Sequence, residues 1–286
     1  MSSSSSLLKE YLDFAINLAR QAGQKLIQWQ TNGFDVMEKG IHFGSMKDLV
    51  TDADAGIENF IFTQLRHRFP DHDFLGEESD GNQMNCLESN RPTWIVDPID
   101  GTTNFTHLFP WSCVSISLAI DQEIVLGVTY CTGQERLYHA IKNGGAFCNG
   151  YPIRVSSNVE KLSEAMIQTG IPIGYTPAEF PVNFSSDLFN TIIWPSKAFR
   201  CVGSCCMALC MVADGSIDAS FMIKIKIWDM VAGYIIIKEA GGYVFNIHGD
   251  KFDPNGGNIL ATGNLELANK IGKLFRKCSQ GIIYKH

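Results

Sequence analysis

The stretch from residue 94 to residue 105 constrains the fold most, because an apolar run changes there abruptly into a polar turn. Residues 94–96 are Trp, Ile and Val, and three apolar residues in a row are typical of a buried strand. Asp97 and Asp100 follow, on either side of Pro98. Proline fixes its own φ and restricts the preceding residue to extended backbone. The sequence therefore predicts a strand that ends in a sharp turn carrying two carboxylates.

This turn can direct the carboxylates of Asp97 and Asp100 and the carbonyl of Ile99 toward one point. Such an all-oxygen ligand set suits Mg²⁺ or Mn²⁺ and does not suit zinc. A glycine and two threonines come next and predict a helix start with Thr102 or Thr103 as the N-cap. Free N–H groups at a helix start bind phosphate, so the stretch indicates metal-assisted phosphoryl chemistry. Taken alone, it is also compatible with an ordinary strand–turn–helix and solvated aspartates.

Three other stretches favour the functional interpretation. Glu77 lies in a Gly-Glu-Glu-Ser segment, Asp229 follows Trp228, and Asp54 ends an acidic segment that begins at Asp48. Together with the central turn, these motifs resemble the inositol monophosphatase family of Mg²⁺-dependent, lithium-sensitive phosphatases. The resemblance runs over nearly the whole chain, from about residue 7 to about residue 277.

The resemblance implies an α/β fold of the α+β kind, the layered αβαβα sandwich of the sugar phosphatases. An N-terminal α+β half, residues 1–155, would carry most of the metal ligands. A C-terminal α/β half, residues 156–286, would carry Asp229 and the rim of the substrate site. We place the boundary at a change in composition near residues 155–157, and we expect the site between the two halves.

The resemblance also implies the site residues and their roles. Two or three Mg²⁺ ions are expected, with ligands from Glu77, Asp97, the Ile99 carbonyl, Asp100 and Asp229. One ion lowers the pKa of a bound water, which becomes the nucleophile, and another stabilises the leaving alkoxide. The catalytic residues are Glu77 and Thr102, the latter supported by Asp54 in deprotonating the water. The N–H groups of Gly101 and Thr102 hold the phosphate.

The substrate side of the site departs from the family at Met222. Inositol-specific members carry an acidic residue seven positions before the Asp of Trp-Asp, where it accepts hydrogen bonds from inositol hydroxyls. A thioether is a weak acceptor and cannot replace a carboxylate. Gly203 and Ser204 match a position where relatives offer backbone and hydroxyl groups to the substrate. Unless Asp218 or Ser204 supplies the missing contact, we expect poor hydrolysis of inositol monophosphate and broad substrate tolerance.

The predicted function is hydrolysis of a phosphomonoester, inositol monophosphate above all, by metal-activated water. Two alternatives stay open. One is a relative with another substrate, such as a sugar bisphosphate or a nucleotide 3′-phosphate. The other is a non-catalytic binding or regulatory protein of the same fold. The intact acidic set argues against the second alternative, because clustered carboxylates repel one another when no cation is bound.

Composition limits the partners. The 286 residues carry a formal net charge of −7, and no basic run marks a nucleic-acid site. No apolar run reaches the ~20 residues that span a bilayer. We therefore expect a small phosphorylated substrate, and neither nucleic acid nor a membrane, as the partner. The family resemblance implies a homodimer.

Nine cysteines, an odd number scattered along the chain, do not suggest a disulfide framework. The start of the chain also lacks the pattern of a signal peptide, so a reducing, cytoplasmic location is expected. Four cysteines cluster in the sequence: Cys201, Cys205, Cys206 and Cys210. A soft-metal site is one interpretation of this cluster. The apolar neighbours favour the other, small thiols buried in a helix.

Periodicity predicts the remaining elements. A long helix is expected over residues 8–29, and a second helix opens within residues 48–54, with Thr51 or Asp52 as its cap. The serines at residues 2–6 are expected to form a disordered tail. Strands are expected over residues 74–76, 114–120, 124–130, 135–141, 164–170, 217–221, 243–247 and 258–262. Further helices are expected after Ser204 and over residues 230–240 and 265–275.

Overall fold

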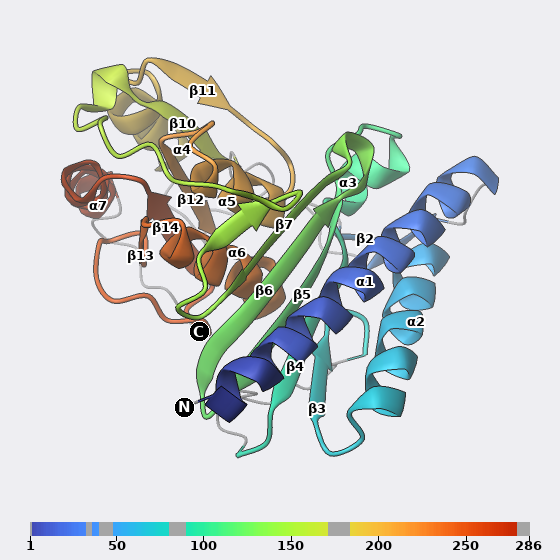
Figure 1. Ribbon diagram of the computed structural model, residues 1–286. Helices are drawn as coiled ribbons and strands as arrows, with labels where there is room; N and C mark the ends of the chain where they lie inside the picture. The colour runs from blue at the N-terminus through green and yellow to red at the C-terminus, as the bar shows by residue number, and fades with distance from the viewer. Residues whose placement is uncertain (1, 33–35, 40–47, 80–89, 171–183, 279–286) are drawn as a thin grey trace.

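The computed structural model describes residues 2–32, 36–39, 48–79, 90–170 and 184–278. Its elements form five layers in the order helix, sheet, helix, sheet, helix (Figure 1). The outer helices of the first layer are α1 (Ser2–Asn32) and α2 (Asp52–Arg68). Helices α5 (Cys205–Ala213) and α6 (Ile227–Glu239) lie between the sheets, and α4 (Phe184–Leu188) and α7 (Leu265–Cys278) cover the far side. The layered α/β sandwich expected from the sequence is confirmed.

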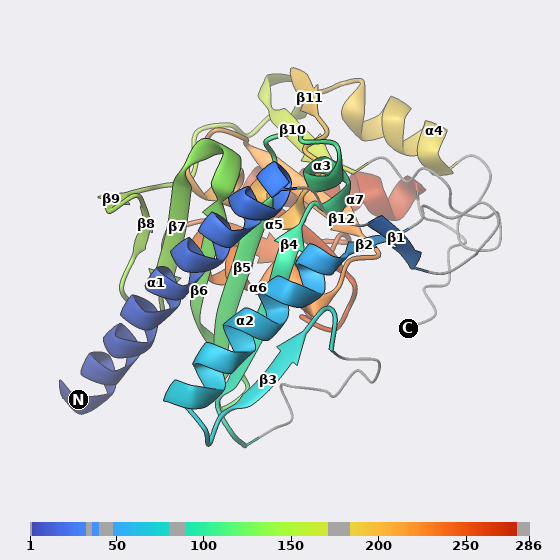
Figure 2. The same cartoon turned by 90° about the vertical axis from the view of Figure 1, so that its right-hand side faces the viewer.

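The first sheet has seven strands in sequence order. Its neighbours are antiparallel, except that β3 and β4 run parallel. The strands are β3 (Asp73–Gly76), β4 (Thr93–Asp100), β5 (Cys113–Ile120), β6 (Glu123–Cys131), β7 (Arg136–Ile141), β8 (Ala146–Cys148) and β9 (Tyr151–Pro152). Helix α3 (Thr102–Thr106) follows β4 directly, at one end of this sheet (Figure 2).

The second sheet is mixed and has five strands in the order β11-β10-β12-β14-β13. The parallel pairs join β10 to β11 and β12, and the antiparallel pairs join β14 to β12 and β13. The strands are β10 (Met166–Thr169), β11 (Ala198–Arg200), β12 (Ala219–Ile223), β13 (Tyr243–Phe245) and β14 (Asn258–Thr262). A separate antiparallel pair consists of β1 (Val36–Lys39) and β2 (Asp48–Thr51).

Burial explains the sequence patterns of α1 and β4. Helix α1 crosses one face of the first sheet, and its apolar stripe is fully buried at Ala15, Ala19 and Ala22 (Figure 2). Every residue of β4 is buried, because α2 packs on one side of this strand and α6 on the other. A strand covered on both faces has a continuous apolar run rather than an alternating one, which is why residues 94–96 have that pattern.

Residues 48–51 form strand β2, and α2 begins at Asp52, directly after the candidate cap Thr51 and within the expected segment. Two other local expectations are wrong. Helix α1 extends to Ser2, where the sequence suggested a disordered tail. Helix α6 begins at Ile227, so Asp229 lies within its first turn rather than at its start. Pairing and packing with distant residues override weak local signals in such short segments.

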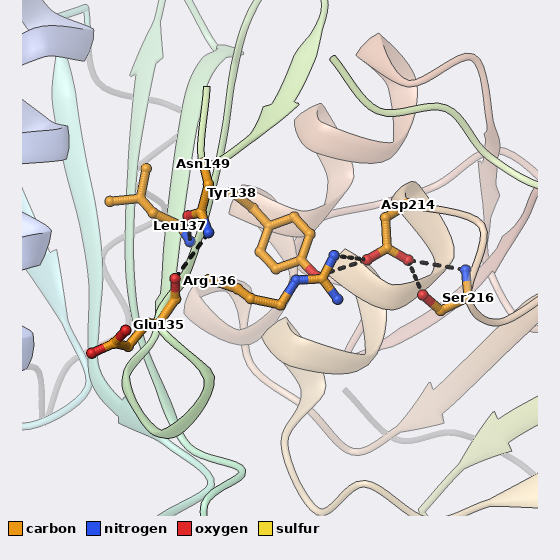
Figure 3. A network of polar contacts seen from close by, with 7 residues as sticks. All are labelled: Glu135, Arg136, Leu137, Tyr138, Asn149, Asp214 and Ser216. Atoms are coloured by element: carbon orange, nitrogen blue, oxygen red, sulfur yellow. Dashed lines mark hydrogen bonds and ion pairs between the residues drawn. The ribbon is translucent and has the colours of Figure 1, made fainter. Parts of the chain in front are cut away.

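A polar network connects the first sheet to the middle helices (Figure 3). Arg136 and Tyr138 on β7 both donate to Oδ2 of Asp214, over 2.7 Å and 2.8 Å. Asp214 is the C-cap of α5, and its Oδ1 accepts the N–H of Ser216. The network therefore holds the end of α5 against the sheet, while the other end of α5 faces the acidic turn.

The first sheet uses residues 73–152 and the second uses residues 166–262, so the boundary at residue 155 falls between them. Helix α6, however, packs against β4, β5, β6 and β7 of the first sheet. The division of the chain into halves at that residue stays a prediction. No helix among the described residues is both long enough and apolar enough to cross a bilayer.

Candidate metal centre

The turn after β4 is built by an irregularity in the sheet. Strand β4 pairs regularly with β5 up to Asp97, opposite Ser115, and the register then shifts before Asp100 pairs with Cys113. Pro98 lies inside the shift and has no N–H to donate to the ladder. The extra backbone turns the carboxylates of Asp97 and Asp100 to the same end of the sheet. Both carboxylates are buried, with 1% and 7% exposure.

Asp229 reaches the same place from α6. Its Oδ2 accepts the N–H of Lys226, the N-cap of this helix, at 2.6 Å. One ligand oxygen from each of Asp97, Asp100 and Asp229 lies within 4.8 Å of the other two. Two elements that are more than a hundred residues apart in the chain therefore supply a single acidic cluster.

Glu77 and Asp54 complete the acidic surroundings. Strand β3 runs parallel to β4 with Gly76 opposite Val96, so Glu77 follows beside Asp97. Asp54 lies in the first turn of α2 and is 1% exposed. Burial first, and then the charges of Glu77, Asp100, Asp229 and Asp54, raise the pKa of Asp97 well above its usual value. The other four predicted carboxylates are thus close enough to Asp97 to raise its pKa.

The environment of the cluster fits a divalent cation. Both carboxylate oxygens of Asp97 are buried and have no hydrogen-bond partner. Burial and the charge of Asp100 raise the pKa of Asp229 to about 7, against a usual 3.8. Buried carboxylates that repel one another and lack donors are costly, and a cation removes both costs. Oxygen atoms alone in this arrangement match the preference of Mg²⁺.

Asp100 is oriented by the start of α5. Its carboxylate accepts hydrogen bonds from the Ser204 hydroxyl at 2.5 Å, from the Cys206 N–H at 2.6 Å and from the Cys205 N–H at 3.1 Å. Ser204 is the N-cap of this helix and also accepts the N–H of Met207. A carboxylate at a helix N-terminus is electrostatically favoured, so the helix fixes the position of Asp100.

The predicted N-cap of α3 is wrong. Gly101 occupies that position in the left-handed region, with φ 89°, and no side chain caps the helix. The hydroxyl of Thr102 instead donates to the Ile99 carbonyl at 3.1 Å. A carbonyl oxygen has two lone pairs, so Ile99 can still accept a cation. Thr102 therefore lies directly beside a predicted ligand.

Sequence reasoning missed Glu58. This residue is 3% exposed on α2, and its Oε2 accepts the N–H of Glu78 at 2.8 Å, which holds the chain just after Glu77. Its spacing of four residues from Asp54 places both carboxylates on one face of the helix. The spacing of Asp54 and Glu58 is the feature of the sequence that could have identified Glu58, because it predicts an acidic face on this helix.

The substrate-side residues lie on the second sheet and the loop before α5. Met222 is half-buried on β12, and its Sδ accepts the N–H of Gly170 at 3.3 Å. Asp218 accepts the Ser156 hydroxyl and the Met166 N–H at 2.7 Å and 2.8 Å. Since Ser204 donates to Asp100, both side chains named as substitutes for an acidic residue at position 222 already have structural partners.

Gly203 precedes the α5 cap with φ 73°, a backbone region that favours glycine. The side-chain amide of Asn104 lies against it and donates to the carbonyls of Trp111 and Val202, at 2.8 Å and 2.9 Å. The bond to Val202 joins α3 to the loop before α5, and the bond to Trp111 joins it to the segment before β5. The roles of Gly203 and Ser204 as substrate contacts stay predictions.

The four clustered cysteines do not gather around one point. Cys201 is exposed in the loop before α5, whereas Cys205, Cys206 and Cys210 are buried in that helix. The described residues therefore place three of the four among the core side chains, as the apolar neighbours suggested. The thiol of Cys206 lies close to the thiol of Cys113 on β5, which is not one of the four clustered cysteines.

Comparisons with known proteins agree with this geometry. A sequence profile of the inositol monophosphatase family matches residues 7–280. Inositol monophosphatase 3 of Solanum lycopersicum is 39% identical over 256 residues, covering 89% of this chain and 92% of that protein. Inositol monophosphatase 1 of Rattus norvegicus is 36% identical over 265 residues, covering 93% and 94%.

Among solved structures, the IMPase of Thermotoga maritima superimposes with a TM-score of 0.82 at 30% identity, covering 96% of this chain and 99% of that chain. Sequence and fold therefore agree over almost the full length of both proteins. The family expected from the motifs is confirmed, and this chain belongs to the inositol monophosphatase family.

Proposed function

We propose that this protein is a Mg²⁺-dependent phosphomonoesterase that hydrolyses inositol monophosphate to inositol and phosphate. The observation that carries the proposal is the convergence of Asp97, Asp100 and Asp229 within 4.8 Å, with both oxygens of Asp97 unpartnered. Membership of the inositol monophosphatase family supports the reaction and the substrate class. The repulsive buried cluster favours a bound cation, and family membership favours an enzyme over a non-catalytic binding protein.

The residues proposed to hold two or three Mg²⁺ ions are Glu77, Asp97, the Ile99 carbonyl, Asp100 and Asp229. Bound Mg²⁺ supplies positive charge that neutralises phosphate oxygens and lowers the pKa of water. Asp100 is held by Ser204 and the start of α5, so the position of at least one ligand does not depend on the cation. Preorganisation of this kind lowers the cost of assembling the site when the substrate binds.

Thr102 is proposed to orient the attacking water and to accept its proton, with Asp54 behind it. The Thr102 hydroxyl donates to the Ile99 carbonyl, which leaves its oxygen lone pairs as acceptors. The N–H groups of Gly101 and Thr102 are proposed to hold the phosphate, beside a backbone turn that glycine permits.

The substrate is the less constrained part of the proposal. Two structures of a staphylococcal IMPase-II are described as bound to inositol monophosphate and to 2′-AMP, at 26% and 25% identity to this chain. Met222 offers a thioether where an acidic residue would bind polyol hydroxyls. The 2′-AMP bound to that relative and the thioether of Met222 favour a second candidate function, hydrolysis of another phosphomonoester such as a nucleotide monophosphate.

The proposal includes further properties that the family resemblance implies: a homodimer, a cytoplasmic location and inhibition by lithium. Sedimentation of the purified protein tests the dimer, and fractionation of cells tests the location. A lithium titration of phosphate release at fixed Mg²⁺ tests the inhibition. None of these properties is needed for the phosphatase reaction itself.

The decisive experiment measures phosphate release from a panel of phosphomonoesters, with Mg²⁺ or with a chelator. The panel contains inositol monophosphate, a sugar bisphosphate, nucleotide 2′- and 3′-monophosphates and an aryl phosphate. We expect release that requires Mg²⁺ and includes inositol monophosphate. Mg²⁺ binding without release from any compound would favour the non-catalytic alternative. Release from nucleotides alone would assign the second candidate function.

A further inference from the structure

A second group of metal-ligating atoms lies beside the acidic cluster, on the side of β5 and α5. One ligand atom from each of Asp100, Cys113 and Cys206 lies within 4.8 Å of the other two. All three residues are buried, and both cysteines are 0% exposed. This group shares only Asp100 with the proposed Mg²⁺ ligands. Two of its three donors are sulfur, whereas the acidic cluster offers only oxygen.

The separation between the Cys113 thiol and the Asp100 carboxylate matches that of a tetrahedral soft-metal site. The Cys113 Sγ lies 3.5 Å from Oδ2 of Asp100. In a tetrahedral zinc site with Zn–S of about 2.3 Å and Zn–O of about 2.0 Å, a sulfur and an oxygen ligand are about 3.5 Å apart. The Ser204 hydroxyl lies 3.6 Å from the same sulfur and 2.5 Å from the same carboxylate oxygen. The Ser204 hydroxyl is therefore a hydrogen-bond donor to this oxygen and not a fourth ligand, because two oxygen ligands of a tetrahedral zinc lie about 3.3 Å apart.

Three separate elements hold these donors in place. Cys113 begins β5 and pairs with Asp100 across the irregular end of the β4–β5 ladder. Cys206 lies in the first turn of α5, and its N–H donates to Asp100 at 2.6 Å. The Cys206 thiol donates to the Asp229 carbonyl at 3.2 Å, so it also contacts the start of α6. The sheet ladder and the helix thus bring both thiols to the carboxylate without any bound ion.

We propose that Asp100, Cys113 and Cys206 form a binding site for a soft divalent cation such as Zn²⁺ or Cd²⁺, and that its occupation excludes Mg²⁺ from the acidic cluster. Thiolate ligands select soft metals, whereas Mg²⁺ requires oxygen. On binding, the two thiols lose their protons to the buffer and both sulfurs bond to the cation. The group loses two protons and gains one dication, so its net charge does not change. Asp100 belongs to both groups, so a dication bound to its carboxylate repels a second dication in the acidic cluster.

The test is a Cd²⁺ titration of the full-length, metal-free, reduced protein. Cadmium bound to thiolate gives a charge-transfer absorption in the ultraviolet that cadmium bound only to carboxylates does not give. Cys86, Cys201 and Cys278 are replaced by Ser in every variant, because Cys201 is exposed, Cys278 is partly exposed and Cys86 lies outside the described residues. We expect one tightly bound Cd²⁺ with the thiolate signal.

The matched control is Cys210→Ala. Cys210 lies one turn further along α5 and is as buried as Cys206, but it does not belong to the group. We expect Cys113→Ala and Cys206→Ala to lose the signal and Cys210→Ala to keep it. Cys113→Ser and Cys206→Ser, which preserve shape, replace any alanine variant whose circular dichroism shows that it has not folded. A signal that persists in both group variants, or that is absent from the parent, would overturn the proposal.

A separate measurement, of Mg²⁺ binding to the Cd²⁺-loaded protein, tests whether the soft cation excludes Mg²⁺. Calorimetry of the Cd²⁺-loaded protein should detect no Mg²⁺ binding at concentrations that saturate the Cd²⁺-free protein. Unchanged Mg²⁺ affinity would refute the exclusion. Neither measurement requires turnover, so a protein without phosphatase activity would still give an answer about the soft-metal site.

Discussion

Asp97 is the residue whose surroundings most strongly demand a cation, because its two oxygens are buried without partners among other carboxylates. We expect Asp97→Asn to lose Mg²⁺-dependent turnover and the stabilisation that Mg²⁺ gives to the folded protein. Calorimetric titration with Mg²⁺ measures the binding directly. Asp121→Asn is the control, since Asp121 is an exposed aspartate with a positive φ that asparagine tolerates. An unchanged Mg²⁺ affinity in Asp97→Asn would remove this residue from the ligand set.

Thr102 is close enough to a predicted ligand for its hydroxyl to act in proton transfer. We expect Thr102→Ala to keep Mg²⁺ affinity while lowering kcat by about 10²–10⁴-fold, the range of general acid–base catalysis. Thr102→Ser should recover most of the loss, because it restores the hydroxyl. Steady-state kinetics at saturating Mg²⁺ measure the effect. A kcat of Thr102→Ala within a few-fold of the parent would show that the hydroxyl is dispensable.

Met222 is the position at which this chain departs from the inositol-specific members of the family, so it determines which substrate we expect. Its sulfur accepts a backbone N–H from Gly170, so a carboxylate there would have a donor at hand and could also reach polyol hydroxyls. We expect Met222→Glu to raise kcat/KM for inositol monophosphate about ten- to a hundredfold, the effect of charge-assisted bonds of ~1.5–3 kcal/mol.

An aryl phosphate, which has no hydroxyls to bind, is the control substrate for this comparison and should gain little. Met222→Leu removes the sulfur without adding charge, and it should not improve either substrate. Equal gains on both substrates, or none, would show that position 222 does not determine specificity.

At the scale of elements, the turn from β4 to α3 depends on Gly101. Its φ is 89°, and an added Cβ would lie 3.0 Å from the Trp111 carbonyl and 3.1 Å from both the Gly203 carbonyl and Ser204 Cβ. We expect Gly101→Ala to destabilise the protein by roughly 1–3 kcal/mol, because both the φ and the contacts are unfavourable. Denaturant unfolding measures the difference.

Gly241→Ala separates the two causes. Gly241 has φ 88° but nothing lies within 4 Å of its added Cβ, so only the backbone cost applies there. The additional destabilisation in Gly101→Ala therefore measures how closely two segments, at Trp111 and at residues 203–204, approach the turn. Equal destabilisation in the two variants would mean that this approach contributes nothing.

For the whole molecule, the acidic cluster makes stability depend on pH and metal together. Burial and Asp100 raise the pKa of Asp229 from 3.8 to about 7, so between these values the folded state binds more protons than the unfolded state. The free energy of unfolding of the metal-free protein should therefore fall as pH rises through this window. Mg²⁺ binds the deprotonated carboxylates, so its stabilisation should grow over the same window.

Thermal unfolding at about pH 5 and about pH 8, with chelator or with Mg²⁺, measures this linkage. The gap between the two melting temperatures should be wider at the higher pH. Asp229→Asn removes the titrating group, so the metal-free variant should lose part of the pH slope. A metal-free slope that is the same in the variant and the parent would contradict the assignment.

Local patterns were sufficient for much of the architecture. The apolar run at residues 94–96, the helical stripe in α1 and the alternation in β5 and β6 predict elements whose positions agree with the structure to within a few residues at most. Backbone preferences and the burial of one face act within a few neighbouring residues, so they leave a readable pattern. The motif around Asp97 likewise identifies the family, because its acidic residues and turn residues have fixed spacing.

Other features depend on contacts between distant segments and have no local pattern. The Cys206 thiol meets Cys113 and Asp100 only because α5 begins at the irregular end of the β4–β5 ladder, about a hundred residues away in sequence. The buried carboxylate of Glu58 meets Gly76 and the N–H of Glu78, which belong to a later segment of the chain. Such convergence depends on strand register and helix packing, which adjacent residues do not encode. The grouping of thiols with a carboxylate was therefore visible only in the folded chain.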